Sequence, residues 1–184
     1  MTKVTTPQAI LSYPHLFEPN TPPGATEPVY SCALVFPKGT DLSELKKAAL
    51  AAAQEKFGNK AESLIRDGKL RMPFRTDAED KGYPEGSTFM NVKNKQRPGI
   101  VSIYPGPDGK PLPINDEGQI YAGCKVRASL RAYAYDVSGN KGVAFSLGNM
   151  QKMADGERLD GRKRAEDEFE ADLSAKPAAL DDLL

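Results

Sequence analysis

Apolar and polar residues alternate along most of this chain, which is the pattern of β-strands that bury one face. Segments rich in Gly and Pro, such as 105–109 and 138–142, interrupt the alternation and predict turns between antiparallel strands. The first run contains Pro14, which predicts an edge strand or a bulge at that point. Strands are predicted over 8–17, 29–36, 87–95, 100–104, 119–136 and 142–150.

The run over 119–136 is longer than an ordinary strand. Its eighteen residues exceed the usual length of about 3–10. A strand of this length must bend strongly, and small closed barrels require such bending. We therefore expect an all-β fold in which a mostly antiparallel sheet of about five or six strands curls into a barrel.

Helical spacing replaces the alternation after the second strand. Apolar residues recur every three or four positions from Leu42 to Phe57, which predicts a helix over that range. Asp41 and Glu44 are spaced to cap its start, and Gly58 is suited to end it. A second, shorter helical turn is predicted over 61–67. One or two helices are therefore inserted between the strands.

The predicted strand over 121–135 separates its side chains by charge, because successive residues of a strand point to opposite faces. One face is small and apolar, and we expect it to face the core: Ala122, Cys124, Val126, Ala128, Leu130, Ala132 and Ala134. The other face mixes cations with tyrosines: Tyr121, Gly123, Lys125, Arg127, Ser129, Arg131, Tyr133 and Tyr135. An ordinary solvated face would explain any single cation, but such a face normally carries both charge signs.

The strand over 87–95 repeats this design, with Thr88, Met90 and Val92 on one side and aromatic and basic residues on the other. Cations contact phosphates, and aromatic rings stack on exposed bases. A duplex hides the faces of its bases, so the combination favours single-stranded nucleic acid. The candidate nucleic-acid-binding residues are Phe89, Lys93, Lys95, Arg97, Tyr121, Lys125, Arg127, Arg131, Tyr133 and Tyr135.

Charge is divided unevenly along the chain, although its formal net charge is zero. Residues 1–164 contain 24 basic and 18 acidic side chains, whereas residues 165–184 contain seven acidic side chains and one basic. We predict a folded domain over 1–156 and a charged linker with a disordered acidic tail over 157–184. The tail is expected to occupy the basic groove when nucleic acid is absent. Its tip is a candidate partner-binding segment: Leu180, Asp181, Asp182, Leu183 and Leu184.

Composition excludes several kinds of protein. Cys32 and Cys124 form no Cys-x-x-Cys pair, which argues against a zinc ribbon or a disulfide framework and predicts free core thiols. His15 is the only histidine, so a multi-histidine metal site is excluded and a polar role at a strand end is expected. The chain has no signal-peptide-like start and no run of membrane-spanning length, which predicts a cytoplasmic protein. No cofactor or metal is predicted.

Three sequence strings occur together: Leu11–Phe17 (LSYPHLF), Tyr121–Asp136 (YAGCKVRASLRAYAYD) and Gly139–Lys152 (GNKGVAFSLGNMQK). With Asp155–Gly161 (DGERLDG) after them, they resemble a family of small phage single-stranded-DNA-binding proteins over most of the chain. The resemblance implies an OB-fold, a five-stranded barrel with an inserted helix. It also implies DNA binding without sequence preference in phage replication or recombination, in the host cytoplasm, and an acidic tail that contacts replication or recombination proteins. Bacterial proteins of that role usually end in an aromatic residue, whereas this chain ends in two leucines.

Two other functions remain open. The segment over 71–86 has neither strand nor helix spacing and is predicted to be a long loop, of the kind that is usually functional or mobile. Its acids Asp77, Glu79 and Asp80 could hold Mg²⁺ in a nuclease, which cleavage of single strands with Mg²⁺ would reveal. A virion or scaffold protein would use the tail for assembly and would not retard an oligonucleotide at low salt. The sequence is also compatible with a homo-oligomer.

Overall fold

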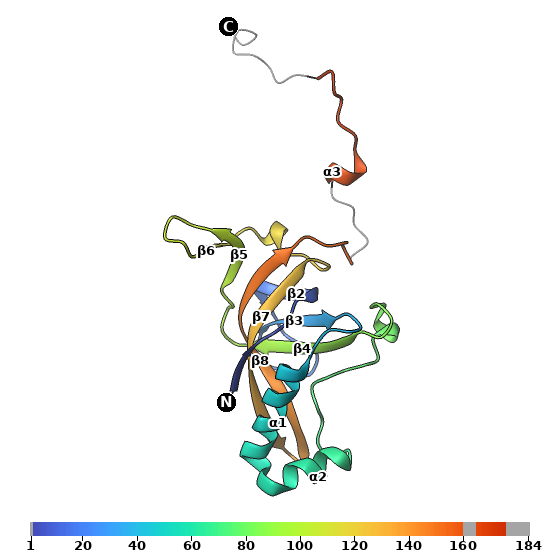
Figure 1. Cartoon of the computed structure of the whole chain (residues 1–184), viewed down its shortest axis with the longest axis vertical. Coiled ribbons are helices and arrows are strands. Elements are labelled where there is room, and N and C mark those ends of the chain that lie inside the picture. The colour runs from blue at the N-terminus through green and yellow to red at the C-terminus, as the bar shows by residue number, and fades with distance from the viewer. Residues whose placement is uncertain (1, 160–164, 176–184) are drawn as a thin grey trace.

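The computed structural model describes residues 2–159 and 165–175 of the chain (Figure 1). In chain order the elements are β1 (Thr2–Thr5), β2 (Ala9–Asn20), β3 (Val29–Phe36), α1 (Ser43–Phe57), η1 (Gly58–Lys60), α2 (Ala61–Arg66), η2 (Glu79–Lys81), β4 (Thr88–Asn94), β5 (Ile100–Pro105), β6 (Pro111–Pro113), η3 (Glu117–Gln119), β7 (Lys125–Val137), β8 (Asn140–Ala154) and α3 (Ala165–Glu168).

Five strands close into a barrel, as predicted. β7 pairs with β2, β3 and β4 follow in order, and β8 pairs with both β4 and β7. The all-β class is confirmed, and the described residues place eight strands in one sheet, because β1 lies along β7 and the β5–β6 hairpin extends from β8. The expected antiparallel order is wrong at β4–β8 and β5–β8, which are parallel. β4 and β8 both run opposite to β7, because β7, β2, β3 and β4 alternate in direction and β8 is antiparallel to β7. The two strands are therefore parallel where the ring closes.

The pairing of the long strand β7 with β8 is irregular. The register shifts between Lys125 and Val126 and again between Ala128 and Leu130, and at both shifts the extra residue lies on β8. Such bulges bend the strand that carries them, so β8 bends where it pairs with the start of β7. β2 and β1 pair with successive parts of β7. The far end of β7 projects with β8 as a long hairpin beside α1 (Figure 1).

Helix α1 packs on the inner face of the β7–β8 hairpin and leaves the outer face uncovered by helix. It contacts β1, β7 and β8 (Figure 1). The predicted cap at Asp41 and Glu44 is wrong: the N-cap residue is Leu42, which makes no side-chain cap hydrogen bond. Asp41 Oδ1 accepts the Ser43 N–H at 3.0 Å just before the helix, and Glu44 contacts Lys47. No helix within the described ranges is long and apolar enough to cross a membrane. Small residues of helix and strand share one core cluster, which allows close packing: Ala48, Ala49, Ala52, Ala53, Ala128 and Ala132.

The segment over 71–86 packs against the barrel. Arg75 and Phe89 exchange backbone hydrogen bonds of 2.9 Å, and the Tyr83 hydroxyl donates to Ser12 Oγ at 2.9 Å. The segment therefore covers one end of the outer faces of β3 and β4. Beneath it lies a second apolar cluster of Val35, Ala78, Tyr83 and Phe89.

The strand expected to start at residue 119 begins at Lys125 instead. The residues before it form η3 and a turn that passes very close to the chain after β8. Gly123 has φ +112°, and a Cβ atom there would collide with the Glu157 carbonyl oxygen. The alternating pattern concealed this turn because Cys124 still points into the core.

Both cysteines are buried free thiols, as predicted. Burial raises the pKa of the Cys32 thiol to about 12 and also raises the pKa of the Cys124 thiol. Thiols with raised pKa values are poor nucleophiles at neutral pH.

We expect Leu130→Ala to lower the free energy of unfolding by about 2–5 kcal/mol, because Leu130 is fully buried in the barrel core. The neighbouring Arg131→Ala should change it by roughly 0.5 kcal/mol or less, because that side chain is exposed. Urea unfolding of the two variants measures both effects. Equal losses would contradict the inward and outward assignment of β7.

Candidate nucleic-acid interface

The strand register places three cations in one row on the outer face of the sheet. Arg131 is the register partner of Lys3 on one side and of Ser146 on the other, and Ser146 is the partner of Lys93. Register partners share a face of a sheet, so Lys3, Arg131 and Lys93 follow one another across β1, β7, β8 and β4. We call these three residues the cationic row.

A hollow of about 400 Å³ lies along this row. Arg97 joins Lys3 and Arg131 in its wall, and its floor is braced by Asn94, whose Nδ2 donates to the Leu147 carbonyl at 2.7 Å. No Asp or Glu among the described residues lines it. We call it the basic hollow.

A second hollow, of about 410 Å³, lies over the outer faces of β3 and β4. Its walls are mostly apolar or aromatic and include Tyr13, Pro22, Pro23 and Tyr133. Of the Lys and Arg residues that the structure describes, only Lys93 lines this hollow, and no described acid lines it. We call it the aromatic hollow.

The two hollows adjoin where Lys93 pairs with Ser146, because Lys93 lines the aromatic hollow and Ser146 lines the basic hollow. Together they form one groove across β3, β4, β8 and β7, bordered by the β2–β3 connection over 21–28. Cations at one end can bind phosphates, and rings at the other can stack on bases.

The two tyrosines at the end of β7 are half-buried. Burial raises the pKa of the Tyr133 hydroxyl, and the neighbouring Tyr135 adds to that rise. Tyr135 lies against its register partner Gly142, where a Cβ atom would collide with the tyrosine hydroxyl. Tyr133 therefore presents its ring to the aromatic hollow, while Tyr135 covers backbone.

Two aromatic residues that the sequence predicted to be exposed on this face are buried instead. Phe89 is 2% exposed, because the 71–86 segment covers it and Arg75 stacks over its ring at 4.8 Å. Tyr121 is 8% exposed and precedes β7 in a turn, where Arg158 lies 4.5 Å from its ring. The expectation that these two rings are exposed on the outer face is wrong.

The remaining predicted cations are spread more widely. Arg97 lies in the basic hollow and over the Phe17 ring at 5.3 Å. Lys95 pairs with Glu27 at 2.6 Å, which lowers the pKa of that carboxyl and raises the pKa of the lysine. Lys125 and Arg127 are exposed on the outer face towards the start of β7, and Arg127 lies about 13 Å from Arg131 at the usual rise per residue.

Lys3, Tyr13 and His15 are among the groove residues that escaped the sequence prediction. Lys3 belongs to a strand of four residues, too short for its alternation to be recognised. Tyr13 and His15 flank Pro14, where the pairing of β2 with β3 is irregular. The predicted bulge at Pro14 is thus confirmed, and it is the signal that could have drawn attention to its neighbours.

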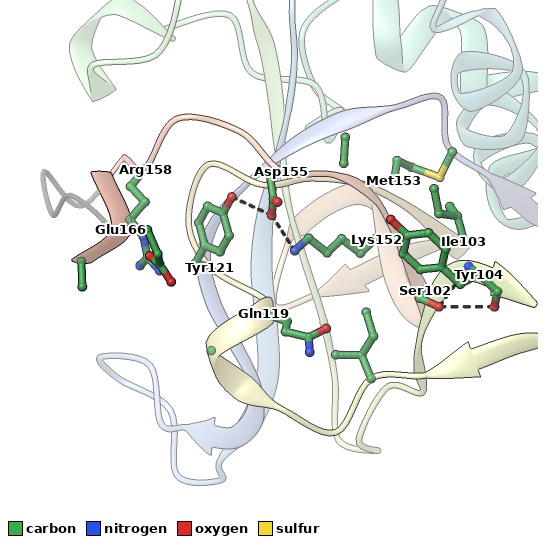
Figure 2. Close-up of a pocket in the computed structure, with 14 residues that line it drawn as sticks. Ser102, Ile103, Tyr104, Gln119, Tyr121, Lys152, Met153, Asp155, Arg158 and Glu166 are labelled. Carbon is green, nitrogen blue, oxygen red and sulfur yellow. Dashed lines mark hydrogen bonds and ion pairs between the residues drawn. The ribbon is translucent and has the colours of Figure 1, made fainter. Parts of the chain in front are cut away.

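The chain leaves the barrel through a tightly packed turn (Figure 2). The Tyr121 hydroxyl lies 3.0 Å from Asp155 Oδ1 and accepts the Gly156 N–H at 3.1 Å, and Asp155 also pairs with Lys152 at 2.7 Å. The Leu159 N–H then donates to the Ala122 carbonyl at 3.0 Å. These contacts fix the point from which the acidic tail starts.

The tail itself is described only in part. Residues 165–175 include the short helix α3. The predicted partner-binding tip, Leu180 to Leu184, lies outside the described residues.

The loop acids do not converge on a metal site. Asp77 is held by Arg75 at 2.7 Å, and within the described ranges no group of three or more His, Cys, Asp or Glu side chains is arranged to hold a metal ion.

The closed five-stranded barrel, with its groove on the outer face of β3, β4, β8 and β7, places the chain in the OB-fold class, whose members bind oligonucleotides or oligosaccharides on the outer face of the barrel. The model of a family described as the ssDNA-binding protein of Enterobacter phage Enc34 matches residues 2–182. The chain belongs to this family.

Relatives and solved structures agree with this assignment. Putative protein p50 of Acyrthosiphon pisum secondary endosymbiont phage 1 is 34% identical over 171 residues, covering 89% of this chain and 90% of p50. The Enc34 single-stranded DNA-binding protein in complex with ssDNA has a TM-score of 0.62 at 23% identity, covering 85% of this chain and 89% of its own. Bacteriophage T7 gp2.5, a single-stranded DNA-binding protein, has a TM-score of 0.61 at 15% identity, covering 89% and 98%. At these identities the two structures show a shared fold.

The raised pKa of Tyr133 makes stability depend on alkaline pH. Because the native state holds this phenolic proton more tightly than the unfolded state, its contribution is present below about pH 10 and is lost as pH rises through the raised pKa. We expect Tyr133→Phe to lose less stability than the natural chain between about pH 8 and about pH 11. Urea unfolding at the two pH values tests this, and equal losses would contradict it.

Proposed function

We propose that this chain binds single-stranded DNA without strong sequence preference and acts in phage DNA replication or recombination. The observation that carries the proposal is the groove that joins the cationic row to the aromatic hollow, since no described residue that lines either hollow is an acid. Membership of the Enc34 family and the ssDNA-bound structure of the Enc34 protein support it.

The aromatic hollow favours a single strand over a duplex. Stacking on a ring such as Tyr133 needs an exposed base face and contributes roughly 1–3 kcal/mol per base, whichever base it is. A duplex offers phosphates to the cationic row but no base faces to the rings, so it should be held more weakly and by charge alone. This binding requires positioned cations and rings and no catalytic group.

The acidic tail is proposed to compete with DNA for the groove. Leu159, the last described residue before the tail, lines a hollow together with Tyr13 and His15, which also line the aromatic hollow. A segment that is tethered beside the groove acts at high effective concentration. Its apolar tip would be left to contact a replication or recombination protein in the host cytoplasm.

Fluorescence titrations of labelled oligo-dT and of a duplex of equal length, at several salt concentrations, test the function. We expect tighter binding of the single strand and an affinity that falls steeply as salt rises. Equal affinity for duplex at every salt concentration would contradict stacking. Cleavage of the strand on addition of Mg²⁺ would indicate a nuclease, and no binding at low salt would indicate a virion or scaffold protein.

Substitution of a cation and substitution of a ring should change DNA binding in different ways. Lys93→Ala and Arg131→Ala should each reduce the slope of log affinity against log salt by about 0.7, because each removes a phosphate contact. Tyr133→Ala should weaken binding by roughly 1–3 kcal/mol and leave that slope unchanged. Lys46→Ala on α1, an exposed lysine away from the groove, is the matched control. If the three groove variants behave alike, the division of roles is wrong.

Truncation after Arg164 should tighten DNA binding, because it removes seven acids and one base and leaves a chain with a net charge of +6. The gain should be largest at low salt and shrink as screening shortens the reach of charge to about 8 Å at physiological ionic strength. A full-length variant with the tail acids replaced by Asn and Gln separates charge from length and should behave like the truncation. A truncated chain that binds no better at low salt would contradict the competition.

A further inference from the structure

Tyr13 stands at a bulge that turns its side chain out of the barrel. Ser12 pairs with Ala33 and His15 pairs with Ser31. Between these two pairs β2 advances three residues and β3 advances two, so β2 carries one extra residue. Leu11 is buried in the core and Ser12 lies outside under Tyr83, so an uninterrupted strand would point Tyr13 inward. Instead Tyr13 has φ +45° and is 67% exposed. A bulky residue seldom adopts this backbone conformation, which costs stability.

Two hollows meet at Tyr13. One is the aromatic hollow of the groove, and the other is a hollow of about 530 Å³ beyond it, bordered by Lys81, Tyr83 and Leu159. Tyr13 and His15 line both hollows. Within the described ranges neither lining contains an acid, and each contains a lysine. The outer hollow has a volume typical of sites for small ligands, roughly 300–1,000 Å³.

We propose that Tyr13 separates two successive bases of a bound single strand, and that the hollow beyond it is a further base subsite. This inference rests on the proposed function and extends the groove past the aromatic hollow. An exposed ring between two hollows can stack a base on either face, and the lysine on each side can bind the phosphate that links the two nucleotides. Stacking on DNA offsets the cost of holding the ring outward at a strained position.

A single tryptophan can report directly on this subsite, because the chain contains none. Tyr13→Trp should keep its affinity for oligo-dT, and its fluorescence should be quenched on binding. The matched control is Tyr104→Trp, since Tyr104 is also 67% exposed but lies on the β5–β6 side of the barrel. Quenching of the Tyr13→Trp variant alone supports the proposal. Equal quenching in both variants, or quenching in neither, overturns it.

Affinity and stability should move in opposite directions at this position. Tyr13→Gly should weaken oligo-dT binding by about 5- to 150-fold while its thermal midpoint stays the same or rises, because glycine adopts positive φ freely. Tyr13→Phe should retain binding, and Tyr104→Ala should leave it unchanged. A merely structural residue would instead lose stability and affinity together, which would overturn the proposal.

Three further outcomes separate this subsite from the proposed function and from binding of the tail. If Tyr13→Gly binds like the natural chain while Arg131→Ala binds more weakly, the groove stands and the subsite is wrong. If the natural chain does not bind oligo-dT, the proposed function itself is wrong. If the Tyr13→Trp fluorescence changes on truncation after Arg164 but not on addition of DNA, the hollow holds the acidic tail and the subsite proposal is overturned.

Discussion

Closure of the barrel through β7 is the constraint on which the rest of the structure depends. β7 pairs with β8 along one edge and with β2 and β1 along the other. It can do so only if the sheet curls, and the two bulges of β8 opposite the start of β7 help to supply that curvature. Once the ring is closed, one face of β7 must be small and apolar, and the opposite face must point to solvent. The segregation of charge on β7 therefore follows from closure, and the cationic row uses the face that closure leaves outside.

The 71–86 segment decides which part of that outer face is available. It covers Val35 and Phe89, and its Tyr83 contacts Ser12. The outer surface of β3 and β4 beyond this point remains open and forms the floor of the aromatic hollow. The 71–86 segment thus limits the groove at one end, and the β2–β3 connection limits it along one side.

The alternating pattern correctly predicted which side chains of β7 point inward and which point outward. It failed where segments that are far apart in the sequence pack together. It placed Val126, Leu130 and Ala132 in the core and Arg131 outside, and the structure confirms this. It placed Phe89 outside, because no local pattern shows that residues 71–86 return to cover it. The parallel pairing of β4 with β8 was missed for the same reason, since it joins strands that lie about fifty residues apart in the sequence.

The places where the sequence departs from ordinary folding preferences gather on the groove. The like charges of the cationic row repel one another, and the exposed Tyr13 has a strained backbone at positive φ. Neither feature helps the barrel to fold, because both could be replaced by neutral polar residues at no loss of core. Natural sequences tolerate such local conflicts chiefly at functional sites. A polyanion with exposed base faces would neutralise the row and stack on the ring, so one kind of ligand relieves both conflicts.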